Sequence, residues 1–239
     1  MAPYDRAPAS AEQVSTAAVF RLFVLSPSAD VGVGLVRCAQ AQGHAGVIDA
    51  ETASDCDAVE RCIAGLGRAP APGLDPVAAG FGLKLGMRGA AWQARLPAWR
   101  QAGLRWLILA REDLHQWADA EALAAFRAGG GQLYLETTTW DADCPALEAN
   151  IDGWWLKGHE AGGWVGEETS FVLLQRAVRQ ARRPLMVRGG LGVHAAAACA
   201  LGGAAGGVLD DQLLLLPECG LAADLAPWLE RLGGTECVP

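Results

Sequence analysis

The sequence has very little lysine, because Lys84 and Lys157 are the only two among its 19 basic residues. The other basic residues are arginines, and 27 acidic residues leave a formal net charge of −8. A nucleic-acid partner needs clustered basic residues that neutralise phosphates, so this charge argues against one. The arginine bias also suits a GC-rich genome, so composition explains part of the scarcity of lysine.

The sequence also lacks any apolar run of about 18 residues, the length that spans a bilayer. Residues 1–16 are rich in Ala, Pro and Ser without a secretory signal pattern, so we expect a disordered leader before one domain over residues 17–239. The seven cysteines form no CxxC pair, and their number is odd. Reduced thiols in the cytoplasm are the simplest interpretation, and no metal site is predicted.

Apolar runs typical of strands alternate with helix-like segments along the chain. The predicted strands are Phe20–Leu25, Ala45–Ile48, Phe81–Lys84, Leu104–Leu109, Gln132–Glu136, Ile151–Leu156, Pro184–Val187 and Ala205–Leu209. The predicted helices are Val31–Gln42, Asp57–Leu66, Ala90–Ala102, Ala118–Ala128, Pro145–Asn150, Thr169–Ala181, Val193–Leu201 and Ala222–Leu232. Eight strand–helix pairs without a domain-sized break predict an α/β protein with a single (β/α)8 TIM barrel. An open, doubly wound sheet is the alternative.

The carboxyl ends of the predicted strands carry many charged side chains. In a parallel barrel these ends and the loops after them form one mouth, where ligands bind. The predicted mouth residues are Ser26, Ser28, Asp49, Lys84, Arg111, 136–139, 157–164, 188–192 and 210–212. This mixture of both lysines, two arginines and several carboxylates indicates a functional site.

The segment after the sixth predicted strand begins with Lys157, His159 and Glu160. Lys157 is interpreted as a substrate-binding cation, as a Schiff-base nucleophile, or as an ion-pair partner of Glu136 or Glu160 that braces the mouth. Glu160 is a candidate general base or an acceptor for backbone N–H groups of the glycine loop. His159 is either a catalytic group or an ordinary loop residue. With Glu136, these residues form the candidate catalytic set.

Three segments carry a resemblance to a known group of enzymes. They are Gly158-His-Glu-Ala-Gly-Gly163, Met186-Val-Arg-Gly-Gly-Leu-Gly-Val-His194 and Ala204-Ala-Gly-Gly-Val-Leu-Asp-Asp-Gln212. The chain resembles the nitronate monooxygenases and FMN-dependent enoyl reductases over about residues 132–218, and more loosely over its whole length. It is especially similar to the barrel at the N-terminus of some bacterial polyketide synthases.

The resemblance implies that FMN binds at the mouth, with its phosphate between the loops after the seventh and eighth strands. Gly189, Gly190 and Gly192 match the first of these loops, where glycine N–H groups at a helix start form an anion nest. Without the resemblance, Gly189 and Gly190 would indicate only a tight turn. Gly162 and Gly163 match the loop that borders the flavin.

Two positions depart from the pattern of that group. Trp164 stands where the nitronate-oxidising members place a catalytic histidine, and an indole cannot abstract a proton, so nitronate oxidation through that base is not expected. Asp210 and Asp211 stand where Gly with Ser or Thr usually binds the phosphate. A like charge about 4 Å away costs on the order of 1–4 kcal/mol, whereas a helix N-terminus returns roughly 0.3–1 kcal/mol. Repulsion therefore wins unless Arg188 neutralises the carboxylate.

The leading prediction is a flavin-dependent oxidoreductase of the 2-nitropropane dioxygenase or enoyl reductase type, associated with polyketide or fatty-acid-type biosynthesis. Lys84, Lys157 and Trp164 would position a small molecule or an acyl thioester, and polyketide synthase domains would be partners. One alternative is a cofactor-free lyase or decarboxylase that uses Lys157 with Glu136 or Glu160. The other is a catalytically inactive barrel that docks or supports a synthase.

Overall fold

The computed structural model describes residues 19–29, 31–53, 56–66, 80–86, 92–116, 120–221 and 225–232. The predicted leader at residues 1–16 lies outside these ranges.

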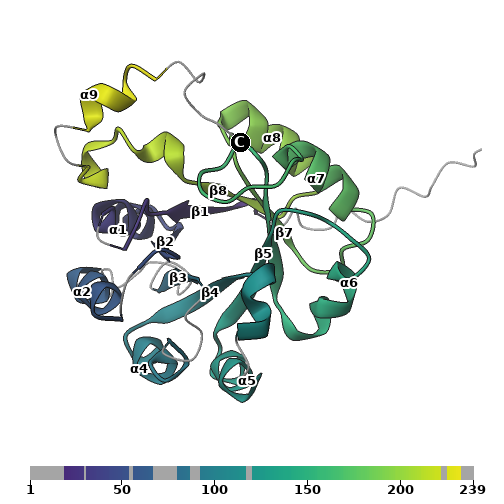
Figure 1. Cartoon of the computed structure of the whole chain (residues 1–239), viewed down its shortest axis with the longest axis horizontal. Coiled ribbons are helices and arrows are strands. Elements are labelled where there is room, and N and C mark those ends of the chain that lie inside the picture. Colours follow the sequence, from purple (N-terminus) through teal and green to yellow (C-terminus); the bar gives the residue numbers. More distant parts are fainter. Residues whose placement is uncertain are drawn as a thin grey trace, which may run out of the picture.

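Eight parallel strands close into a barrel, with β8 paired to β1. The strands are β1 Arg21–Leu25, β2 Ala45–Ala50, β3 Phe81–Leu85, β4 Leu104–Ala110, β5 Gln132–Thr137, β6 Gly153–Lys157, β7 Leu185–Arg188 and β8 Gly206–Leu209. They follow one another around the barrel in chain order (Figure 1). The prediction of a single (β/α)8 barrel is confirmed, and the open-sheet alternative is excluded.

Helices surround the strands on the outside of the barrel (Figure 1). The α-helices are α1 Val33–Ala41, α2 Cys56–Leu66, α4 Leu96–Gln101, α5 Ala120–Ala128, α6 Cys144–Leu147, α7 Ser170–Ala177, α8 Val193–Leu201 and α9 Ala226–Leu229. The 3-10 helices are η1 Arg111–Gln116, η2 Glu148–Asn150, η3 Asp211–Leu213 and η4 Pro217–Cys219. The helix predicted over Pro145–Asn150 is thus divided between α6 and η2.

The ends of several elements differ from the predictions. Strand β2 continues past its predicted end because Asp49 pairs with Lys84 of β3, and Ala50 with the residue after it. Because of this extension, the inward-facing Asp49 belongs to β2 and lies at the mouth. Helix α7 is shorter than predicted, but its start is the predicted one, because the Thr169 hydroxyl accepts the N–H of Val172 at 3.3 Å.

Alternate strand residues fill the inside of the barrel with aromatic rings. The ring of Phe23 lies edge-on to Trp106, Tyr134 and Trp155, with centroid separations of 5.9, 5.7 and 5.3 Å. A Cβ added to Gly153 would lie 2.4 Å from the Tyr134 ring, so glycine makes room for it. The barrel axis is therefore a packed core, and ligands can enter only at an end.

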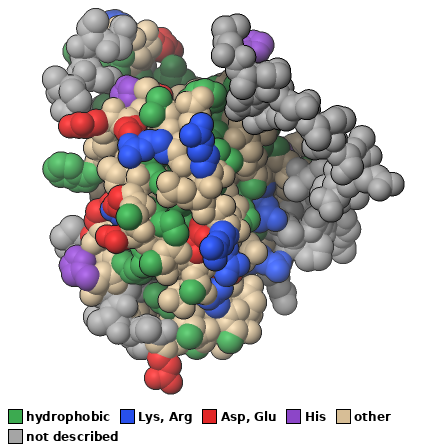
Figure 2. All heavy atoms as spheres, turned by 90° about the vertical axis from the view of Figure 1, so that its right-hand side faces the viewer, with side chains coloured by type: hydrophobic (Ala, Val, Ile, Leu, Met, Phe, Trp, Pro, Cys, Tyr) green, Lys and Arg blue, Asp and Glu red, His purple; other side chains and the backbone are tan. Residues whose placement is uncertain are grey.

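The outer surface holds a groove between residues 140–142 and α7, with a volume of about 530 Å³. Arg176 and Arg179 are among its lining residues. The side of the molecule that carries α6 and α7 shows both basic and acidic side chains (Figure 2). None of the residues proposed as catalytic or ligand-binding from the sequence lines this groove.

The helices that the structure describes include none with both the length and the apolar character needed to cross a membrane.

We predict that Phe23→Ala destabilises the protein by about 3–5 kcal/mol, because it removes the ring at the centre of the aromatic cluster. Urea unfolding followed by circular dichroism measures this loss. The matched control is Phe171→Ala on α7, where the side chain is 42% exposed and the expected loss is much smaller. Equal losses for the two variants would contradict the packed interior.

Candidate active site

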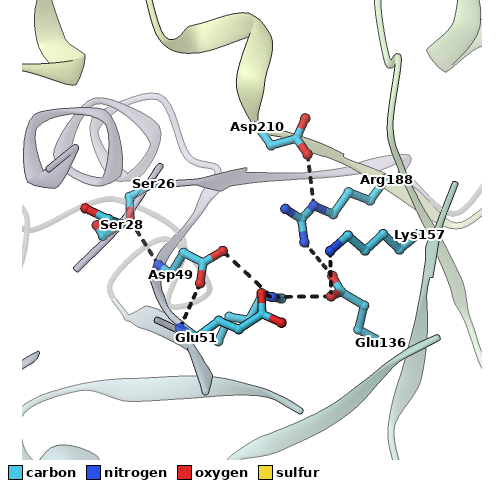
Figure 3. A network of polar contacts seen from close by, with 9 residues as sticks. Ser26, Ser28, Asp49, Glu51, Glu136, Lys157, Arg188 and Asp210 are labelled. Atoms are coloured by element: carbon cyan, nitrogen blue, oxygen red, sulfur yellow. Dashed lines mark hydrogen bonds and ion pairs between the residues drawn. The ribbon is translucent and has the colours of Figure 1, made fainter. Parts of the chain in front are cut away.

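The last inward-facing positions of the strands bring charged side chains together at one end of the barrel. They are Asp49 on β2, Lys84 on β3, Glu136 on β5, Lys157 on β6, Arg188 on β7 and Asp210 directly after β8. Figure 3 shows Asp49, Glu136, Lys157, Arg188 and Asp210 pointing toward one another from their separate strands. The alternation of strand residues accounts for this, because the inward positions two residues earlier include Tyr134, Trp155 and Met186 of the inner core.

Glu136 is the centre of this network. Its Oε2 accepts a hydrogen bond from Nη1 of Arg188 at 2.7 Å, and its Oε1 lies 3.3 Å from Nζ of Lys84 and 3.8 Å from Nζ of Lys157. Burial alone would raise the pKa of this carboxyl group, but Lys84, Arg188 and Lys157 lower it to about 2. Glu136 is therefore an ionised carboxylate that three buried cations share.

Two of the three cations have further anionic partners. Lys84 forms an ion pair with Glu51, and its Nζ lies 3.8 Å from Oδ2 of Asp49. Nε of Arg188 donates to Oδ2 of Asp210 at 2.9 Å. Burial by itself would lower the pKa of the Lys84 ammonium, but the surrounding carboxylates raise it. Lys84 and Arg188 are thus charged groups held in place by the fold.

Lys157 has a different environment. Its side chain is 2% exposed, and its Nζ donates no hydrogen bond to any residue that the structure describes. The predicted pair with Glu136 is present at 3.8 Å, which is too long for a hydrogen bond. Burial lowers the pKa of Lys157, and the charges of Arg188 and Lys84 lower it further, while Glu136 opposes this. Nζ of Lys157 thus makes no hydrogen bond within the described part of the chain, whereas Nζ of Lys84 donates one to Glu51.

Glu160 lies at the start of α7 and not against Lys157. Its Oε2 accepts the backbone N–H of Ser170 at 2.9 Å, and its Oε1 lies 3.4 Å from Oγ of the same serine. Of the two interpretations of Glu160, this geometry favours an acceptor of backbone N–H groups, although the donor belongs to the helix. Nδ1 of His159 lies 4.0 Å from Oε2 of Glu160, and its side chain is half exposed.

The glycine loop after β6 passes directly beside Lys157. Gly163 has a left-handed φ of 79°, and Nζ of Lys157 lies 3.4 Å from the position that a Cβ on this glycine would take. The next residue, Trp164, is 88% exposed. No side chain of residue 163 therefore occupies the space beside the Lys157 amine, and the indole of the following residue, Trp164, is exposed to solvent.

The loop after β7 leads into α8 through Gly189 and Gly190, which have left-handed φ values of 111° and 61°. Gly192 is the N-cap of α8 and provides no side-chain acceptor for the first N–H groups. A Cβ added to Gly192 would meet nothing within 4 Å, so the space in front of this helix start is open. Free N–H groups at a helix start attract anions.

The two carboxylates after β8 have partners within the protein. Asp210 is paired with Arg188, so the condition for tolerating it near a phosphate is met. Asp211 accepts the backbone N–H of Gly162, and burial together with the neighbouring Asp210 raises its pKa. The side chain of Gln212 also connects this loop to the preceding one, because it accepts from Asp210 N and donates to the Leu191 carbonyl, both at 3.0 Å.

Two features of the network do not follow from reading the chain one strand at a time. Glu51 was not predicted, because the second strand was expected to end at Ile48, and the longer β2 brings Glu51 next to Lys84. Arg188 was expected at the mouth, but its position between Glu136 and Asp210 depends on how the strands are paired. Among the described residues, no group of three or more His, Cys, Asp or Glu side chains could hold a metal ion.

Known structures share this fold at low sequence identity. FabK from Thermotoga maritima matches with a TM-score of 0.73 and 16% identity, over 89% of this chain and 65% of that one. Nitroalkane oxidase from Streptomyces ansochromogenes matches with a TM-score of 0.67 and 20% identity, over 88% and 71%. A mutant of (S)-mandelate dehydrogenase matches with a TM-score of 0.57 and 14% identity, over 81% and 67%.

The chain therefore spans about two thirds of the length of these proteins. No model of a known protein family matches it, and no curated protein matches its sequence. At these identities the likeness shows the fold alone, a single (β/α)8 barrel.

We predict that Glu136→Gln destabilises the protein by roughly 3 kcal/mol or more, because it leaves three buried cations without their shared anion. Glu168→Gln is the matched control, since its partner Arg176 is exposed and such pairs contribute about 0–1 kcal/mol. Urea unfolding at neutral pH compares the two losses. Similar losses would show that Glu136 is not the centre of the network.

The lowered pKa of Glu136 also predicts a dependence of stability on pH. A carboxyl group whose pKa is lower in the folded state stabilises the fold above its ordinary pKa of 4.5, and this contribution is lost as the pH falls toward about 2. Urea unfolding of the wild type between these values should show this loss. Glu136→Gln should lack that part of the dependence, and an unchanged acid profile in the variant would contradict the assignment.

Proposed function

We propose that the protein is a flavin-dependent oxidoreductase that binds FMN at the charged end of its barrel. The observation that carries this proposal is the left-handed pair Gly189–Gly190, which leads into the open N-terminus of α8. The motif resemblance expects the FMN phosphate at this loop. The fold shared with a nitroalkane oxidase and a mandelate dehydrogenase supports the same class of reaction.

The residues present at this loop fit a phosphate group. The first N–H groups of α8 have no side-chain acceptor at the N-cap, and the space before Gly192 is open. Asp210 does not bring an uncompensated charge, because Arg188 lies against it at 2.9 Å. Two further carboxylates lie near this loop, and each accepts a backbone N–H group. Asp211 accepts that of Gly162, and Glu160, whose Cβ lies 3.4 Å from the position that a Cβ on Gly190 would take, accepts that of Ser170.

The chain's own side chains would orient the substrate and shield it from water. A bound flavin supplies the hydride exchange. Lys84 and Arg188 are held by carboxylates, so they provide fixed positive charge at the mouth for an anionic or carbonyl oxygen of the substrate. Trp164 offers exposed apolar surface beside this end, and its indole cannot act as a base. Nitronate oxidation through a histidine at this position is therefore not part of the proposal.

An acyl thioester of polyketide or fatty-acid-type biosynthesis is the substrate class that the motifs favour. The segments from Leu135 to Thr138, Lys157 to Gly163 and Val208 to Leu215 are those in which the chain resembles the barrels of bacterial polyketide synthases. Synthase domains in the cytoplasm are the corresponding proposed partners.

Titration of the purified protein with FMN tests the proposal, and we expect saturable binding seen as a change in the flavin spectrum. Gly190→Ala should weaken binding about tenfold or more, because an alanine at this left-handed φ strains the loop. Gly43→Ala is the matched control, since Gly43 also has a positive φ of 79° but lies after α1. A wild-type protein that takes up no FMN would refute the proposed cofactor.

We also predict that Asp211→Asn tightens FMN binding by roughly three- to tenfold, because it removes one negative charge beside the proposed phosphate position. Glu230→Gln, an exposed substitution of the same charge, should leave the affinity unchanged. Fluorescence titration of FMN at low salt measures both constants. Unchanged or weaker binding by Asp211→Asn would mean that this carboxylate does not face the phosphate.

A further inference from the structure

The side chain of Lys157 is almost wholly buried, and Glu136 is its one charged partner among the residues that the structure describes. Its side chain is 2% exposed, and its three possible N–H donors make no hydrogen bond to the residues that the structure describes. A buried charge is costly unless it is both paired and hydrogen-bonded. The 3.8 Å contact with Glu136 therefore compensates this group only in part.

Lys84 is the internal comparison, because it is the same residue type in the same network. Its Nζ pairs with Glu51 and lies 3.3 Å from Glu136 and 3.8 Å from Asp49. Lys84 thus has a hydrogen bond to one carboxylate and two more carboxylates within 4 Å, whereas Lys157 has a single carboxylate at 3.8 Å. The fold keeps Lys84 charged and leaves the Lys157 nitrogen available.

Burial and the neighbouring cations Arg188 and Lys84 also lower the pKa of Lys157, so its ammonium group releases a proton more readily than an ordinary lysine. Glu136 is the nearest carboxylate, but Arg188 and Lys84 approach its oxygens more closely than Lys157 does. A lysine that is desolvated beside other cations is a common form of an activated amine nucleophile. The glycine at position 163 keeps the space next to this nitrogen free of a side chain.

We propose that Lys157 is a nucleophilic lysine that forms a Schiff base with an aldehyde or ketone substrate. Nζ releases one proton to solvent, and its lone pair attacks the carbonyl carbon. Transfer of a second proton from nitrogen to the former carbonyl oxygen gives a neutral carbinolamine. A proton taken up from solvent lets the hydroxyl group leave as water while the C=N bond forms, so that ammonium and carbonyl give a protonated imine and one water overall. No oxidant or reductant is needed for this step.

The network accommodates the product of this step as well as its reactant. The protonated imine carries the same single positive charge as the ammonium group. Glu136, ionised because its pKa is held at about 2, therefore has a cationic partner before and after the condensation. Glu136 is in this respect a positioning residue, and the reacting atom belongs to Lys157.

This inference goes beyond the proposed oxidoreductase function, because the condensation needs no flavin. It concerns a substrate with a free carbonyl group, and it makes use of a lysine that the FMN proposal does not require for phosphate binding. The two proposals can fail separately when each is measured on the protein without the other ligand.

The experiment is reductive trapping of the flavin-free protein with propionaldehyde and cyanoborohydride, followed by intact mass measurement and peptide mapping. The chain is well suited to it, because Lys84 and Lys157 are its only lysines. We expect the adduct at Lys157 to form at least about tenfold faster than at Lys84. The same reaction in urea is the control, since both lysines should then react alike.

Lys157→Met should abolish the fast adduct and keep the fold, because it replaces an incompletely compensated charge by an apolar side chain of similar length. Mapping on the wild type decides the question even if this variant does not fold. Modification of Lys84 as fast as of Lys157, or of neither lysine before unfolding, would overturn the proposal. FMN binding measured in parallel reports on the oxidoreductase function alone.

Discussion

The arrangement of the mouth depends on one carboxylate that three cations share. Glu136 accepts Arg188 at 2.7 Å and lies within 4 Å of both lysines of the chain. Each of these side chains comes from a different strand, so closure of the barrel is what brings the charges together. Because these charges are buried, their interactions are strong, and removing any one partner lowers the free energy of unfolding substantially.

The packed interior below the mouth explains why the charges remain there. The rings of Phe23, Trp106, Tyr134 and Trp155 fill the inside of the barrel. The charged side chains that follow on the same strands therefore lie at the mouth. The proposed FMN phosphate position lies at its edge, where the loop after β7 enters α8. Within the network, Lys84 and Arg188 donate hydrogen bonds to carboxylates, whereas Lys157 has only its 3.8 Å ion pair with Glu136. This difference separates the side chains that maintain the mouth from the one that is available for chemistry.

The sequence predicted the order of the strands and most residues of the mouth, because alternation and strand ends are local properties. It placed Lys84, Glu136 and Lys157 at one end of a barrel, and the structure brings them together. It did not predict Glu51, whose position depends on the extended pairing of β2 with β3. The central place of Arg188 likewise depends on strand register. The partner of Glu160 is the start of α7, and a separation of ten residues across a loop carries no local signal.

The most direct test is to measure the pKa of each lysine by NMR, in protein that contains ¹³C-labelled lysine and is titrated with pH. Lys157→Arg assigns the two signals. The account predicts that Lys157 loses its proton below the ordinary pKa of 10.5 and that Lys84 keeps its proton above it. Two lysines that titrate together near the ordinary pKa, or in the reverse order, would contradict the unequal sharing of Glu136.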